Sequence, residues 1–228
     1  MNPDVASVVE RVVSSGVGQS DISGTLRLLG VLTVMSLIPA ILILMTSFTR
    51  IVIVLSLVRY AIGTPSIPPT SLVVSLALIL TTITMGSTFQ KAYQNGLEPY
   101  LDNKTNLRES VDATLSPFRD FMFRFTGDRE LALFAEATGK RSIKHRNEVS
   151  TGVLISAFAT SELRTAFEMG FMMLLAFLVI DLVVASFLMA MGMMMVPPMT
   201  ISLPVKILVF VLADGWYRVM KSLITSFQ

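Results

Sequence analysis

Four ionisable residues stand in apolar stretches of the sequence: Arg50, Glu162, Asp181 and Lys206. An ionisable group inside an apolar helix of a membrane protein is a default candidate for a proton or ion site. Asp181 is the clearest such candidate, because it interrupts the apolar run of residues 170–189. No second acidic residue lies close to it in sequence, which favours a structural carboxylate held by a basic partner or a backbone amide.

Three adjacent methionines, Met193, Met194 and Met195, stand between a glycine at position 192 and two prolines at positions 197 and 198. Proline lacks the amide hydrogen and clashes with the preceding turn, so a helix that arrives from residue 181 must end there. Methionine is unbranched and polarisable, and a cluster of it makes an adaptable apolar surface. We interpret the run as a soft gasket that parts and closes again, in preference to simple apolar filler.

The composition favours an integral membrane protein: 53% of the 228 residues are hydrophobic, 15% are charged, and the mean hydropathy is +0.69. A net charge of +2 is too small to indicate a nucleic-acid partner. The chain has no cysteine and a single histidine, His145, which excludes disulfides, thiol chemistry and a multi-histidine metal centre. No metalloprotease, phosphate-loop or serine-hydrolase motif occurs. We therefore predict a non-enzyme without catalytic residues, cofactor or metal.

The elements that must position these side chains are helices, and we predict an all-α protein. Residues 1–27 are expected to form an N-terminal arm, and residues 28–90 a hydrophobic helical hairpin that turns at the Gly- and Pro-rich segment 63–69. Residues 91–152 hold most of the charges and are expected to face water. Residues 153–228 are expected to form a second hydrophobic hairpin, which carries the gasket.

Two helices are predicted in the charged region. Ser116 is expected to cap one of them, with Pro117 in its first turn. Asp128 is expected to cap the other, over residues 129–138, with Gly139 as its stop.

The last apolar segment, residues 197–216, is a poor candidate for a bilayer span. Its nine Leu, Ile, Val and Phe residues contribute about 3–5 kcal/mol toward insertion, against the cost of burying Lys206 and Asp214. Pro204 is expected to add a break. We therefore expect this segment to pack on protein rather than on lipid.

Six stretches of the sequence resemble the signatures of the FliP family, the flagellar export-gate proteins related to SctR of injectisomes. They are Thr46 to Ile51 (TSFTRI), Ser161 to Phe171 (SELRTAFEMGF), Ile180 to Ser186 (IDLVVAS), Met189 to Pro198 (MAMGMMMVPP), Ile201 to Lys206 (ISLPVK) and Phe210 to Trp216 (FVLADGW). Many relatives carry a proline where this chain has Ser156 and Ala176. The kinks that those prolines would produce are therefore not predicted for this chain.

The resemblance implies a subunit of the bacterial type III export apparatus, packed as helical hairpins into a ring-shaped or helical hetero-oligomer. It implies several copies, expected to be five, with FliQ and FliR around a pore, and contact with FlhB, FlhA, unfolded export substrates and membrane lipid. Met193, Met194 and Met195 match the family's gasket. Glu162 and Lys206 match charges that pair between helices or subunits, and we expect these two to pair with each other.

The implied location is the bacterial inner membrane at the flagellar basal body, partly on the periplasmic side. The alternative function is a small-solute or ion channel, or a secondary transporter, with Asp181 as the ion site. Co-purification with FliQ- and FliR-like chains would distinguish the two functions.

Overall fold

The computed structural model describes residues 43–64, 66–139, 148–193 and 195–228, together with scattered positions between 29 and 41. The chain divides into two units, Met1–Leu42 and Ile43–Gln228, and the second unit carries all the elements below. The predicted arm, residues 1–27, lies outside the described residues. All regular structure in the described ranges is helical, which confirms the predicted fold class.

The first two long helices of the second unit form a hairpin. Helix α3 (Phe48–Ile62) ends at Gly63, whose φ of 90° is a left-handed conformation that glycine adopts without strain. Helix α4 (Thr70–Thr84) then runs back against α3. The turn predicted at residues 63–69 is therefore confirmed.

The uncharged run after this turn is broken, although its composition reads as one helix. At Met85 the chain bends by 66° into α5 (Gly86–Ala92), the π-helical turn η1 (Tyr93–Leu97) and α6 (Glu98–Leu101). The bend is held by tertiary contacts, because the buried Met85 Sδ accepts the Ser47 amide at 3.3 Å and Ser47 Oγ lies 2.8 Å from Thr84 Oγ1.

The predicted start of a helix at Ser116 is wrong. Helix α7 (Leu107–Phe125) begins earlier and carries Pro117 in its interior. Packing outweighs the hydrogen bond that proline removes: Ser110 Oγ donates to the Gly96 carbonyl at 2.9 Å, and a Cβ at Gly96 would lie 2.7 Å from the Thr114 amide nitrogen. Helix α8 (Asp128–Ala137) agrees with the second predicted helix, and Gly139 follows it at a φ of 79°.

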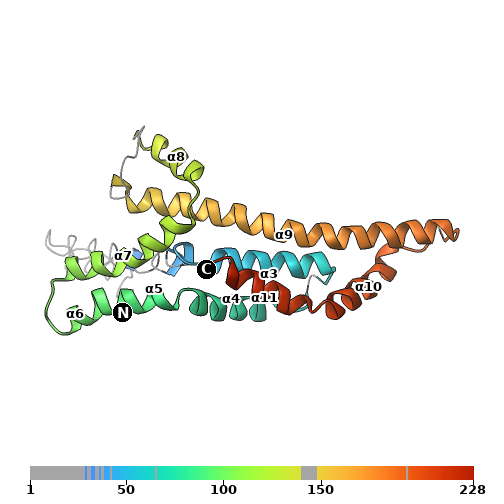
Figure 1. The fold of residues 1–228 in the computed structure, drawn as a ribbon, viewed down its shortest axis with the longest axis horizontal. Helices are drawn as coiled ribbons and strands as arrows, with labels where there is room; N and C mark the ends of the chain where they lie inside the picture. Colours follow the sequence, from blue (N-terminus) through green and yellow to red (C-terminus); the bar gives the residue numbers. More distant parts are fainter. Residues whose placement is uncertain are drawn as a thin grey trace, which may run out of the picture. The chain divides into compact units, whose positions relative to one another are not determined.

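Helix α9 (Thr151–Ala190) is 40 residues long and organises the unit, since α3, α7, α8 and α10 all pack along it (Figure 1). It is continuous through Ser156 and Ala176, the two positions where the family resemblance raised the question of a kink. Among the described residues, α9 alone is a single helix long and apolar enough to cross a membrane. The α4 to α6 segment and the α10 to α11 segment qualify only if each bent pair counts as one span.

Helices α10 (Pro198–Leu212) and α11 (Gly215–Thr225) complete the chain and meet at a bend of 62°, where Asp214 is left-handed with φ 51°. The break predicted at Pro204 is wrong, because α10 continues through it. Pro204 and Thr200, whose carbonyl would receive the missing hydrogen bond, are both exposed, so no buried polar group is left unpaired.

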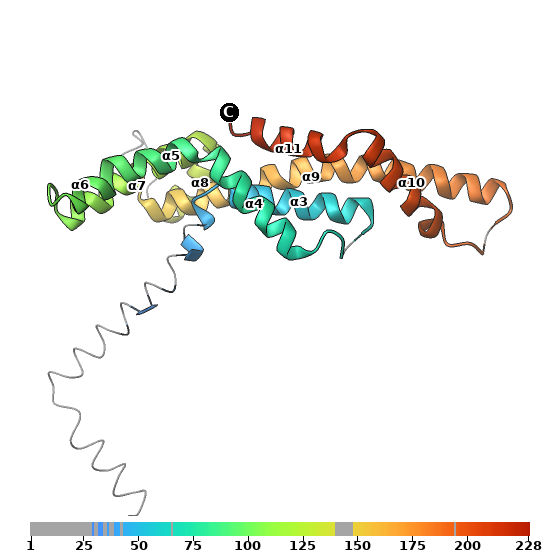
Figure 2. The same ribbon diagram turned by 90° about the horizontal axis from the view of Figure 1, so that it is seen from below.

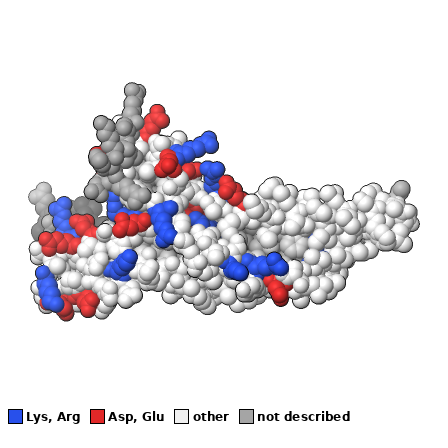
Figure 3. All heavy atoms as spheres, in the orientation of Figure 1, with Lys and Arg blue, Asp and Glu red and all other residues white. Residues whose placement is uncertain are grey.

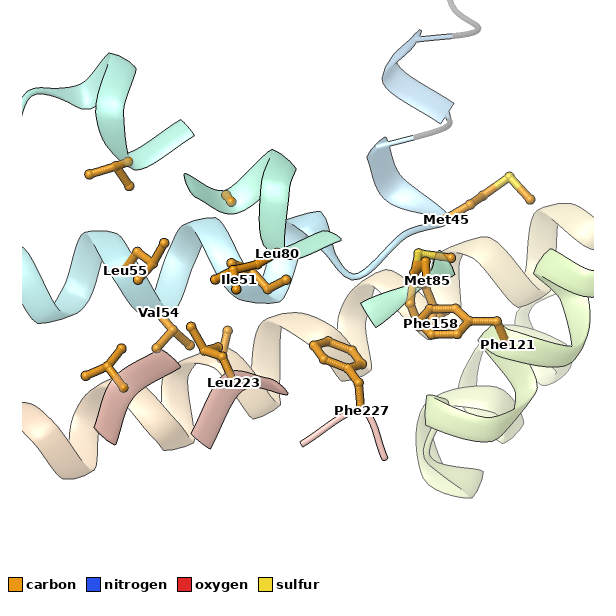
Figure 4. Close-up of a cluster of buried hydrophobic side chains, with 14 of the residues drawn as sticks. Met45, Ile51, Val54, Leu55, Leu80, Met85, Phe121, Phe158, Leu223 and Phe227 are labelled. Atoms are coloured by element: carbon orange, nitrogen blue, oxygen red, sulfur yellow. The ribbon is translucent and has the colours of Figure 1, made fainter. Parts of the chain in front are cut away.

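The core lies where α3, α4, α7, α9 and the C-terminal segment meet. Figure 4 shows side chains from these elements pointing toward one another, among them Ile51, Val54, Leu55, Leu80, Met85, Phe121, Phe158, Leu223 and Phe227. Four aromatic rings, those of Phe121, Phe125, Phe158 and Phe227, are packed with centroids 4.9–6.1 Å apart. The core therefore anchors one end of α9, and the other end extends away from it (Figure 2).

Candidate functional site

The methionine run lies in the bend between α9 and α10, as the flanking glycine and prolines predict. Helix α9 closes with hydrogen bonds from the Gly192 amide to the Met189 carbonyl and from the Met193 amide to the Leu188 carbonyl, each of 3.0 Å. Gly192 has a φ of 74°, which only glycine adopts readily. Pro197 then precedes the first turn of α10. Met194 lies outside the described residues.

Most of the described side chains of this bend, which we call the tip (residues 187–199), are exposed, although Leu188 is buried and Met193 is partly buried. Met195 is 97% exposed, Met199 is 74% exposed and Phe187 is 63% exposed. No Asp, Glu, Lys or Arg occurs between Asp181 and Lys206. Figure 3 shows the contrast on one face, where charged side chains gather over the α5 to α8 end and the α9 to α10 end carries none.

The exposed apolar surface continues down α9 and α10, where Leu182, Val183, Leu208 and Leu212 are all more than half exposed. An apolar surface of this extent marks contact with protein or lipid, because burying it contributes about 25 cal/mol per Å². The tip therefore has the properties of a surface that another chain or a bilayer covers.

Toward the start of α9, away from the tip, Arg50 on α3 and Glu162 on α9 form a buried ion pair with two hydrogen bonds. Arg50 Nε donates to Glu162 Oε2 at 2.8 Å and Nη2 donates to Oε1 at 2.5 Å, with the two side chains only 4% and 0% exposed. Arg50 Nη1 also donates to the carbonyl and hydroxyl of Ser226, and its guanidinium stacks 4.1 Å from the centroid of the Phe227 ring. One arginine thus joins α3, α9 and the C-terminal segment.

Lys206 on α10 pairs with Asp181 on α9, with Nζ and Oδ2 2.6 Å apart. Lys206 Nζ also lies 3.4 Å from the Ala61 carbonyl. The pair borders a pocket of about 400 Å³ between α3, α9 and α10. Asp181 Oδ1 has no hydrogen-bond partner in the described structure, although the side chain as a whole is 41% exposed.

These contacts correct the expectation that Glu162 and Lys206 pair with each other. Each forms an ion pair between helices, but Glu162 does so with Arg50 and Lys206 with Asp181. The Arg50 side chain is buried, whereas the Asp181 side chain is only partly buried. Within the described ranges, no group of three His, Cys, Asp or Glu side chains is placed to hold a metal ion.

Comparison with known proteins identifies the family of the chain. The model of the FliP family matches residues 31–223, which is most of the chain. The chain belongs to the FliP family. It is 49% identical over 207 residues to the flagellar biosynthetic protein FliP of Bacillus subtilis strain 168, a match that covers 91% of this chain and 94% of that protein.

Two other FliP proteins agree. The flagellar biosynthetic protein FliP of Caulobacter vibrioides is 46% identical over 216 residues, covering 95% of this chain and 81% of that protein. The one of Pectobacterium carotovorum is 43% identical over 229 residues, covering 100% and 89%. The FliP match contains the tip and all four ion-pair residues, but it ends before Ser226 and Phe227, which hold Arg50.

Sequence reasoning missed the partner of each charge. Arg50 and Glu162 are 112 residues apart, and no local pattern links positions at that separation. It also missed Glu130, which joins α8 to α9 through an ion pair of 3.3 Å with Arg164; Arg164 in turn pairs with Glu168 at 2.9 Å. The spacing of Arg164 and Glu168 by four residues on one helix was the available signal.

Proposed function

We propose that this chain is a core subunit of the flagellar type III export gate, in which the methionine tip closes a conduit for unfolded flagellar proteins. Membership of the FliP family and relatives named flagellar biosynthetic proteins support a role in flagellum assembly. The observation that carries the gate role is the tip itself: an uncharged, methionine-rich bend, exposed at the end of a helical hairpin.

The gate role is supported by the need of an exposed apolar tip for a partner that covers it. An exposed apolar bend is unfavourable in water, and several tips brought together by an oligomer would cover one another. Methionine side chains adapt to changing neighbours, so a ring of them would seal an empty conduit and also close around chains of varied sequence. An oligomer of this chain, expected to be a pentamer, with FliQ and FliR would supply that ring.

Location and further partners belong to the same proposal. Helix α9 is long and apolar enough for a bilayer, which supports a place in the bacterial inner membrane at the basal body. The charged α5 to α8 end supports a water-facing side, which we assign to the periplasm. FlhB and FlhA would be the remaining export-apparatus partners, and unfolded flagellar proteins the cargo.

The alternative, a channel or transporter with Asp181 as its ion site, has less support. Lys206 lies 2.6 Å from the Asp181 carboxylate and neutralises it. A transported cation would first have to displace this ammonium group, which would leave the buried Lys206 charge without a counter-charge.

Cross-linking tests whether the tips converge. The chain has no cysteine, so Met195→Cys creates a single thiol. In membranes that contain FliQ and FliR, oxidation of this variant should give disulfide-linked dimers of the chain. Met172→Cys, at a position 72% exposed on α9 away from the tip, is the matched control and should give few. Equal cross-linking at the two positions, or none at residue 195, would contradict the converging tips.

A further inference from the structure

Between α5 and α7 lies a small polar pocket, of about 170 Å³, that the gate role leaves unexplained. Helices α5 and α7 run side by side there (Figures 1 and 2), joined by the edge-to-face contact of Phe89 and Phe118 at 5.7 Å. Six of the residues that line it carry the argument: Ser87, Thr88 and Lys91 from α5, and Asp120, Phe121 and Arg124 from α7.

The pocket offers two positive charges, and neither forms an ion pair with a described Asp or Glu side chain. Lys91 makes no ion pair with any described carboxylate, and the described polar contact of Arg124 is a hydrogen bond from Nη2 to the Gln228 carbonyl. The Arg124 guanidinium also lies 5.4 Å from the centroid of the Phe125 ring. The hydroxyls of Ser87 and Thr88 add two further donors beside these two charges, and the buried Phe121 lines the same pocket.

Two cations and two hydroxyls are the groups that proteins use to bind phosphate oxygens. One carboxylate, Asp120, lines the same pocket and would repel a bare phosphate, but it suits a ligand whose phosphate carries an ammonium group nearby. We propose that this pocket binds a phosphate group with an adjacent amine, with Lys91 and Arg124 on the phosphate and Asp120 on the ammonium.

The position of the pocket in the chain points to the source of that phosphate. No Asp, Glu, Lys, Arg or His occurs between Arg59 and Lys91, so Lys91 is the first charge after a long uncharged run. Helix α4 in that run exposes Leu72, Leu78 and Ile83, and the pocket begins directly after the bend at its end. If α4 faces acyl chains, the pocket lies at the depth of the headgroups, where basic pockets bind lipid phosphates. The assignment to a lipid headgroup rests on the proposed membrane location. The assignment to a phosphate group rests only on the side chains that line the pocket.

The test uses the assembled complex purified in detergent and measures bound ligand by native mass spectrometry. Phosphatidylethanolamine, phosphatidylglycerol and diacylglycerol with the same acyl chains are titrated separately, and inorganic phosphate is added as a competitor. Phosphatidylethanolamine should bind best and diacylglycerol should not bind at this site. The double variant Lys91→Ala/Arg124→Gln should weaken phospholipid binding about tenfold or more, since it removes charge-assisted hydrogen bonds.

Two further variants sharpen the result. Lys104→Ala removes an exposed lysine that pairs with Asp102 outside the pocket, and it should leave binding unchanged. Asp120→Asn should remove the preference for phosphatidylethanolamine over phosphatidylglycerol while phosphate-dependent binding remains. If Asp120→Asn leaves the preference intact, the assignment of the ammonium group is overturned.

A measurement on the unaltered chain covers the case in which the double variant fails to assemble. Bound phospholipid should slow the acylation of Lys91 by an amine-reactive reagent and should leave Lys104 reactive. If millimolar inorganic phosphate protects Lys91 as well as the lipid does, the phosphate site stands and its source is free phosphate. Binding of diacylglycerol as tight as that of phospholipid, or no protection of Lys91 by either phosphate source, would overturn the proposal. None of these outcomes depends on the tip, so failure of the gate function would be seen separately.

Discussion

Arg50 and Glu162 are joined by two parallel hydrogen bonds in the interior, where α3 crosses α9, and both side chains are shielded from water. The fork of the guanidinium matches the two carboxylate oxygens, and Ser226 satisfies a further nitrogen. Arg50 also stacks on Phe227, so the pair fixes the C-terminal segment as well as the two helices. It therefore anchors the base from which the tip extends.

Removing one partner of this pair should be costly. Glu162→Gln leaves the Arg50 charge buried without a counter-charge, and we expect a loss of about 3–5 kcal/mol in the free energy of unfolding. Glu168→Gln removes an exposed partner of Arg164 and should cost less than about 1 kcal/mol. Thermal unfolding of the two purified variants in one detergent measures the difference. The apolar double variant Arg50→Met/Glu162→Leu should be more stable than Glu162→Gln alone; the reverse order would contradict the account of the cost.

Gly170 should be required for the close packing of α3 on α9. A Cβ at this position would lie 2.3 Å from Leu57 Cδ1 and 2.8 Å from Leu57 Cβ, so the helices would have to separate. We expect Gly170→Ala to destabilise the chain by about 1–3 kcal/mol. Gly152→Ala, in the same helix with open space around it, should be neutral or stabilising by up to about 1 kcal/mol. Adding Leu57→Ala to Gly170→Ala should restore stability, and failure to do so would argue against a steric cause.

The Lys206 to Asp181 pair gives a test of which charges belong together. Each single change, Asp181→Lys or Lys206→Asp, should destabilise the assembled complex by about 1–3 kcal/mol, because it removes the ion pair. The double exchange Asp181→Lys/Lys206→Asp should restore the pair and with it the assembly. Exchanging Glu162 and Lys206 should restore nothing, because the structure gives these residues different partners. Recovery of the complex during purification is the measurement. Rescue by the second exchange alone would favour the pairing expected from sequence.

Acid should weaken the contact of α8 with α9. The Glu130 backbone amide and the Arg164 guanidinium hold the pKa of the Glu130 carboxyl below its usual range, although desolvation opposes them. Because the pKa is lower in the folded state, this carboxylate stabilises folding above its unfolded-state pKa. The contribution is lost as the pH falls through the folded-state pKa. Thermal unfolding at neutral pH and at about pH 4 should differ less for Glu130→Gln than for the natural chain. If the two chains show the same difference between the two pH values, Glu130 does not contribute to the loss of stability in acid.

The parts of the fold that sequence predicts are those set by local chemistry. The turn at residues 63–69, the stop at Gly139 and the bend that holds the methionines all follow from glycine and proline in their ordinary roles. Residues 117 and 204 show the limit of that reasoning. Both prolines lie inside helices, because packing in α7 and exposure in α10 make the lost hydrogen bond tolerable.

The parts of the site that sequence does not predict depend on contacts distant in the chain. Apolar surroundings correctly mark Arg50, Glu162 and Lys206 as charges that need a partner, but burial alone does not say which one. The break at Met85 is likewise held by Ser47, the residue that precedes α3, and leaves no pattern in the uncharged run itself. The pocket between α5 and α7 was missed for the same reason, since its charges come from two helices.

The role of the tip is tested most directly by the ion conductance of membranes that contain the assembled complex. Replacing Met193, Met194 and Met195 together with alanine shortens the side chains that we propose as the seal. The natural complex should hold a membrane closed, and the triple variant should conduct ions while it still assembles with its partners. Met172→Ala, an exposed methionine away from the tip, should stay closed. A fully assembled triple variant that is as tight as the natural complex would contradict the methionine seal.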